Sequence, residues 1–234
     1  VQAMRATWNA QQANEGWRAV DDREIYLVEQ QVTVTPSGDW AEVELFETYE
    51  NQTALRQEVV YYVTLPESAV ITAVSLGTTP NRDEAFSHRV APRGAAQAVY
   101  RNEVRRNVDP ALMEQIGPSQ YRIRIFPGEP VEWRWDEQSQ QSSVEDAAPL
   151  YFWLNYRTVA QEDGWPLPYL ADGRNVYWDD ETIRLLNGEP LAENEPDWLP
   201  TVIQADNVTP ATHRVDFANG QSVVAIPAEA EAIP

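Results

Sequence analysis

The chain of 234 residues contains no cysteine and no lysine, and it has no long uninterrupted apolar run. Without cysteine it can form no disulfide, no thiolate metal site and no cysteine nucleophile. A membrane-spanning helix would need an apolar stretch of about 18 residues, and none is found. Because the sequence starts at Val1 without a charged-then-apolar leader, we expect a processed or excised piece of a longer protein, a soluble region between membrane segments.

The charge balance is strongly acidic. All 17 basic residues are arginine, and against 37 acidic residues they leave a formal net charge of −20. Such a surface repels nucleic acid and anionic lipid, so we exclude both as general partners; a membrane is reached only through flanking segments outside this chain. The same charge favours solubility in a salty medium, a cation-rich partner or bound calcium.

Period-two alternation predicts a β-hairpin near the start of the chain. Tyr26, Val28, Val32 and Val34 share one parity in the first run, and residues 36–39 have turn chemistry. Further strands are predicted at 59–63, as a central strand, and at 70–76, 121–125 and 150–156. The second strand of the hairpin has its inward residues at Ala41, Val43, Leu45 and Tyr49.

Helical spacing interrupts the strands. The apolar residues Ala96, Val99, Tyr100 and Val104 recur at helical intervals, and residues 180–186 are a weaker helix candidate. A second short helix is predicted from Asp109 and Pro110, a capping residue and a first-turn proline, and it ends at Gly117. Its inward residues would be Leu112, Met113 and Ile116.

Four phrases in the right order resemble the vault protein inter-alpha-trypsin (VIT) domain over residues 24–160: 47–51, 63–71, 95–105 and 122–130. The resemblance implies a mainly β fold, an antiparallel VIT-like β-sandwich with one or two short inserted helices and an irregular C-terminal extension. We expect a lead-in segment at 1–23, the sandwich at 24–160, the extension packed on the same domain at 161–227 and a linker tail at 228–234.

Three further phrases, at 76–82, 108–112 and 162–168, resemble a VIT-bearing integral membrane protein family of exosortase (PEP-CTERM) bacteria, largely cyanobacterial. This resemblance implies an extracytoplasmic location, on the periplasmic or cell-surface side of a membrane-anchored protein. It also implies a role in envelope protein sorting or surface assembly.

The leading functional hypothesis is a non-enzymatic protein-interaction or scaffolding domain with a protein partner and no cofactor. Its candidate partner-binding residues are the arginines of one helical stripe and the tyrosine beside them, where guanidinium groups could bind an acidic segment or be neutralised internally. These residues are Arg93, Tyr100, Arg101, Arg105 and Arg106.

A carbohydrate-binding module is the first alternative. Exposed aromatic rings stack on sugars, although large aromatics also fill β-sheet cores. The candidate sugar-stacking residues are Trp133, Trp135 and Trp153.

Structural calcium is a separate option, because oxygen ligands gather on a turn-rich stretch that lacks EF-hand spacing. The candidate ligands are Asp172, Asn175, Asp179, Asp180 and Glu181.

A hydrolase using two carboxylates is the weaker alternative. Glu42 and Glu44 share one strand face, but we expect that face to be solvated. The two histidines, His88 and His213, lack a serine in a nucleophile-elbow context. The sequence therefore identifies no catalytic residue.

Overall fold

The computed structural model describes residues 24–91, 93–105, 111–136, 141–145, 147–170, 174–191, 198–205, 208 and 212–226. Strands make up 55% and helices 9%, which confirms the mainly β prediction. No helix in these ranges is long and apolar enough to cross a membrane.

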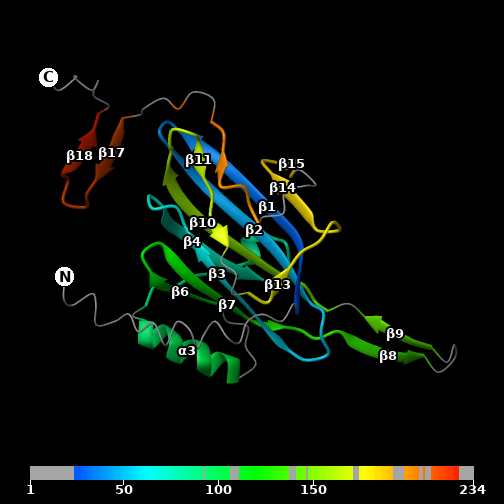
Figure 1. Ribbon diagram of the computed structural model, residues 1–234. Helices are drawn as coiled ribbons and strands as arrows, with labels where there is room; N and C mark the ends of the chain where they lie inside the picture. Colours follow the sequence, from blue (N-terminus) through cyan, green and yellow to red (C-terminus); the bar gives the residue numbers. More distant parts are fainter. Residues whose placement is uncertain are drawn as a thin grey trace.

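The larger sheet has the strand order β15-β14-β1-β2-β10-β4-β5 (Figure 1), and β13 also pairs with β1. Most neighbours are antiparallel, but β13 and β14 run parallel to β1. The strands are β1 (Ile25–Ser37), β2 (Trp40–Asn51), β4 (Val70–Gly77), β5 (Phe86–Ser87), β10 (Leu150–Val159), β13 (Val176–Tyr177), β14 (Ile183–Leu186) and β15 (Glu189–Pro190).

The predicted hairpin is formed by β1 and β2, which pair from Ser37 opposite Trp40 to Ile25 opposite Asn51. In β2 the residues predicted to face the core do so. In β1 the prediction is correct after the register shift between Leu27 and Glu29 and wrong in the residues before it. A β-bulge inserts one residue and exchanges the two faces of a strand. Ile25 and Leu27 are therefore buried in place of Tyr26 and Val28.

The smaller sheet has the order β12-β3-β7-β6, with β6 at one edge. Its strands are β3 (Gln57–Thr64), β6 (Ala111–Gly117), β7 (Gln120–Gly128) and β12 (Tyr169–Leu170). Because β3 lies between β12 and β7, its prediction as a central strand is confirmed. The apolar residues Val59, Val63, Ile123 and Ile125 of this sheet share one buried core with Leu45, Phe152 and Tyr156 of the larger sheet.

Helix α3 (Arg93–Arg105) confirms the main predicted helix, and a single 3-10 turn, η1 (Arg82–Glu84), lies between β4 and β5. The other two helix predictions are wrong: β6 occupies the residues of the second helix, and β14 lies within 180–186. In β6, pairing with β7 overrides the local helical pattern, because Glu114 on β6 finds its ion-pair partner Arg122 directly opposite on β7.

The C-terminal part of the chain contributes to the same core through Trp165, Leu167, Trp198 and Leu199. Its remaining strands are β11 (Trp165–Pro166), which pairs with β16 (Val202–Ile203), and a separate hairpin of β17 (His213–Asp216) and β18 (Ser222–Ala225). A second two-stranded hairpin is formed by β8 (Glu132–Asp136) and β9 (Gln141–Glu145). It projects from the side of the molecule opposite to the β17–β18 hairpin (Figure 1).

Candidate functional site

An apolar cleft of about 880 Å³ opens between the edges of the two sheets. One wall is formed by β4, β5 and the segment that follows them, and the other by β6 and α3. Phe152 and Ile123, both fully buried core residues, line its floor. The cleft therefore reaches from the surface into the hydrophobic core of the sandwich.

Large apolar side chains are exposed around this opening. Phe86 is 71% exposed, Val90 91% and Val99 60%, and all three line the cleft. Removing apolar area from water stabilises an association by about 25 cal/mol per Å². The walls thus offer a surface that a bound partner would shield from water.

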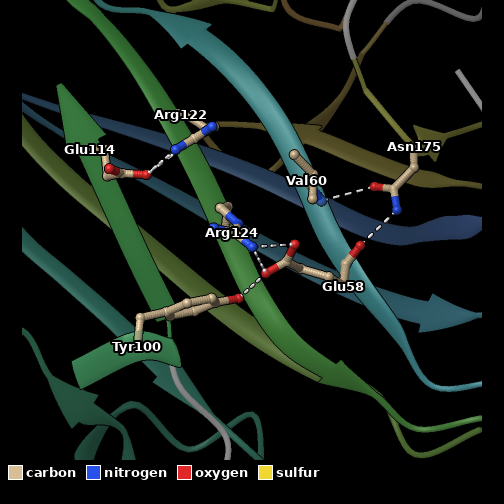
Figure 2. A network of polar contacts seen from close by, with 7 residues as sticks. All are labelled: Glu58, Val60, Tyr100, Glu114, Arg122, Arg124 and Asn175. Atoms are coloured by element: carbon tan, nitrogen blue, oxygen red, sulfur yellow. Dashed lines mark hydrogen bonds and ion pairs between the residues drawn. The ribbon is translucent and has the colours of Figure 1, made fainter. Parts of the chain in front are cut away.

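Helix α3 is fixed on the outer face of the smaller sheet by Tyr100. The Tyr100 hydroxyl donates a hydrogen bond to Glu58 Oε1 on β3, and Arg124 Nη2 lies 2.9 Å from the same carboxylate (Figure 2). The Arg124 guanidinium also lies 4.8 Å from the centroid of the tyrosine ring. Burial, and next the negative charge of Glu58, raise the pKa of Tyr100, so this side chain stays a neutral donor.

A second polar contact joins the helix to the edge strand β6. Glu114, only 4% exposed, accepts a hydrogen bond from Gln97 on α3. It also accepts one from Arg122 Nη2 at 2.5 Å (Figure 2). Burial acts against the charge of Arg122, but its hydrogen bond to Glu114 and the carboxylate charge outweigh it and raise the pKa of Arg122. Glu114 is therefore neutralised within the wall of the cleft.

Arginines are frequent in the part of the sequence that supplies β5, the segment after it and α3, in contrast to the rest of the chain. Residues 86–108 contain five arginines and a single acidic residue, Glu103, in a chain of net charge −20. Arg89 lines the cleft and is exposed, and Arg101 and Arg105 are exposed on α3, which forms part of one wall; we call these three arginines the rim. An anionic segment that is repelled elsewhere would be attracted here.

The predicted partner-binding residues lie on or near α3, whose residues Ala96, Val99 and Tyr100 line the cleft. Tyr100 is 2% exposed and its hydroxyl is bonded to Glu58, so it supports the helix, and its side chain also contributes to the lining of the cleft. The side chain of Arg93, at the start of α3, and all of Arg106 lie outside the described part of the chain.

The structure does not present Trp153 as a sugar platform. Trp153 is 4% exposed because Arg82 lies over its ring, 5.3 Å from the ring centroid, and Phe46 packs at 5.1 Å. Trp133 and Trp135 belong to β8, where they pair with Val144 and Ser142, and their side chains are outside the description.

Asn175, a predicted calcium ligand, is hydrogen-bonded through its side chain to the backbone of β3. Its Oδ1 accepts from Val60 N at 2.9 Å and its Nδ2 donates to Glu58 O at 2.7 Å (Figure 2). Both amide atoms join this loop to the sheet, so the side chain of Asn175 has a structural role here.

The other predicted calcium ligands are not assembled into a site. Asp179 accepts from Tyr26 OH at 2.8 Å, Asp180 and Glu181 are exposed, and Asp172 lies outside the described residues. Across the described ranges, no group of three or more acidic or histidine side chains could hold a metal ion.

The carboxylates Glu42 and Glu44 lie on the outer face of the larger sheet, as predicted. Arg157 lies 3.4 Å from Glu42, and Asn155 Nδ2 donates to Glu44 at 2.9 Å. His88 extends the β5 pairing, because its backbone N donates to Val74 O at 3.0 Å and its Nδ1 accepts from Val74 N at 3.3 Å. These contacts are structural.

Sequence reasoning located the arginines but missed the cleft. Its lining comes from segments far apart in the chain, and the expected helix at 110–116 hid the edge strand β6. The signal available in the sequence was the pair of apolar residues Phe86 and Val90 within a mostly polar stretch, and both are exposed in the structure.

Comparison with known protein families agrees with this fold. Residues 27–132 match the family model of the vault protein inter-alpha-trypsin (VIT) domain. The VIT match covers most of β1, then β2 to β7 with α3, but it ends before β10, the strand that lies between β2 and β4. The resemblance seen in the sequence is confirmed for this segment. No curated protein matches the sequence.

Two solved structures show weak similarity. The solution structure of CaCohA2 from Clostridium acetobutylicum is 10% identical, covers 64% of this chain and 74% of its own, and has a TM-score of 0.28. A crystal structure of a CaDoc0917–CaCohA2 complex at pH 5.5 is 12% identical. The match covers 69% of this chain and 94% of the matched chain, with a TM-score of 0.23. TM-scores this low do not establish a common fold.

Proposed function

We propose that this protein is a non-enzymatic interaction domain whose binding site is the apolar cleft together with its arginine-rich rim. The observation that carries the proposal is the coincidence of the two features. A cleft that reaches the core is lined by residues 86–91 and by α3, and the sequence from 86 to 108 is net positive in a strongly acidic chain. The partner would be a protein segment with both apolar and acidic side chains.

The polar groups of the cleft support binding rather than turnover. Glu114 is held by Arg122 and Gln97, and the Nδ1 atom of His88 accepts a backbone hydrogen bond. A general acid or base must be free to exchange a proton with a substrate. Glu114 is not arranged for that task, and His88 uses one ring nitrogen to hold the strand edge.

The rim would supply orientation and association rate, and the apolar walls would supply affinity. Exposed charge pairs contribute about 0.2–1 kcal/mol each and are screened by salt. Reversing one rim arginine removes an attraction and adds a repulsion, so we expect about a tenfold loss of affinity at low salt. Charges on remote faces should matter far less.

The test uses a synthetic ten-residue peptide that alternates valine and glutamate, and a matched peptide with lysine in place of glutamate. Binding is measured by fluorescence anisotropy for the wild type, for two separate rim variants, Arg101→Glu and Arg105→Glu, and for the control variant Arg214→Glu. Arg214 is a matched control because its side chain is also exposed, so its charge can be reversed in the same way. It lies on the separate β17–β18 hairpin. We expect the glutamate peptide to bind the wild type and the control alike, and the rim variants about tenfold more weakly. Equal loss in all three variants, or equal binding of the lysine peptide, would contradict the site.

The proposal includes a location outside the cytoplasm, as part of a membrane-anchored protein that serves envelope protein sorting or surface assembly. Its support is the sequence resemblance at 76–82, 108–112 and 162–168. Fractionation of the source cells with an antibody to this chain tests it, and recovery in the cytosolic fraction would contradict it.

A further inference from the structure

The edge of strand β6, and not one of its faces, is presented to the cleft. Five consecutive residues, 111–115, line the opening. Successive side chains of a strand point to opposite faces of its sheet. Consecutive residues can all line one space only where the strand's edge borders it, so the backbone of β6 faces the cleft.

This edge is open and regular. β6 is the terminal strand of its sheet, and among the described residues no strand pairs with its outer side. Its register with β7 runs without interruption from Ala111 opposite Ile125 to Gln115 opposite Tyr121. An unpaired, regular edge offers a row of N–H and C=O groups on which another chain can pair.

The opposite wall of the cleft is closed in the ways that protect sheet edges. β5 pairs with β4 at Leu76 and Ser75, and His88 continues the contact at Val74. The remaining part of β4 is irregular, because its register with β10 shifts beside Ile71 and Ala73. Bulges and short covering strands prevent edge pairing. Of the two walls, β6 is therefore the one suited to accept a strand.

We propose that the partner segment binds in an extended conformation, as a fifth strand of the smaller sheet alongside β6. This inference rests on the proposed function and specifies how its site is used. Five paired residues span about 17 Å. Alternate side chains of the added strand would face the apolar interior near Met113 or the exposed Val99 on α3.

Charge determines which occupant is favoured. An acidic strand in the cleft would bring its carboxylates near Arg89, which lines the opposite wall, and near α3, which carries the exposed Arg101. A second copy of this chain would bring another body of net charge −20 against the first. We therefore assign the edge to an acidic, apolar-alternating segment of a different protein.

The test probes the backbone of the peptide. Two versions of the valine–glutamate peptide carry N-methyl groups on alternate residues, one on the odd positions and one on the even positions. In an edge strand only every second N–H faces its neighbour, so one version should lose at least about tenfold in affinity while the other stays within about twofold. Amide hydrogen exchange gives a second readout: alternate amides of residues 111–115 should become protected when the unmodified peptide binds.

The outcomes separate the two proposals. If the unmodified peptide does not bind, the proposed function fails. If it binds but both methylated versions bind equally well or equally badly, and residues 111–115 gain no protection, strand addition is overturned while the binding site stands. If sedimentation shows a dimer without peptide and residues 111–115 are already protected in it, a second copy occupies the edge and the inference is overturned.

Discussion

Replacing Tyr100 with phenylalanine tests how the wall of the cleft is built. The substitution keeps the buried ring and its contact with Arg124 but removes the hydroxyl that donates to Glu58. A hydrogen bond to a charged group contributes about 1.5–3 kcal/mol. We expect Tyr100→Phe to lower the free energy of unfolding by about 2 kcal/mol at pH 7, measured by urea denaturation.

The same variant makes a prediction about pH. Burial, with the charge of Glu58, raises the pKa of Tyr100 in the folded protein, so the native state keeps its proton where the unfolded state loses it. The stability that this tyrosine contributes is fully present below pH 10 or so and falls as pH rises further, by about 1.4 kcal/mol per pH unit. The difference between wild type and Tyr100→Phe should therefore shrink to below about 1 kcal/mol near pH 11.

Tyr121→Phe is the matched control. Tyr121 is half-buried in the same sheet, and burial alone raises its pKa. Tyr121→Phe should lower the free energy of unfolding at pH 7 by less than Tyr100→Phe does, because it removes no hydrogen bond to a carboxylate. If the two variants lose the same stability at pH 7, or if the Tyr100→Phe difference is unchanged at pH 11, the account of how α3 is held is wrong.

Three further substitutions test the surrounding structure. Gly77→Ala places a methyl group 3.0 Å from the Thr79 backbone oxygen and 3.1 Å from the Trp153 ring and should cost about 1–3 kcal/mol, seen as a lower Tm; an unchanged Tm would contradict the close packing around Gly77. Trp198→Phe removes the hydrogen bond of 2.7 Å from the indole Nε1 to the buried Glu47. It should lower the urea midpoint and speed proteolysis of the C-terminal part of the chain, whereas an unaltered midpoint would show that Glu47 does not anchor that part. Asn175→Asp should lose about 1–3 kcal/mol because the Nδ2 donor is lost, and millimolar calcium should not restore the Tm; restoration by calcium would revive the metal-site hypothesis.

The sequence predicted the strands well wherever alternation was uninterrupted, as in β2 and β10. It was wrong in β1, because nothing local marks the bulge that follows Leu27. It was also wrong in β6, where tertiary pairing with β7 overrides a pattern that suits a helix. Local periodicity reports burial only while the register stays regular.

Buried acids could not be predicted, because their partners are remote in sequence. Glu47 is 1% exposed in β2 and accepts from Gln30 Nε2 at 2.9 Å and from Trp198 Nε1, which lies 151 residues away. The cleft has the same origin, since its walls come from β4, β5, α3 and β6. The arginine-rich rim was predictable because it is contiguous in the chain.

The most direct test of the cleft as a protein-binding site is a chemical-shift titration of the isotope-labelled chain with the valine–glutamate peptide. Our account predicts that shifts concentrate at residues 86–91, 96–101 and 111–115, the walls and rim of one opening. Shifts gathered instead on the outer face of the larger sheet, around Glu42, Glu44 and Tyr151, would contradict it.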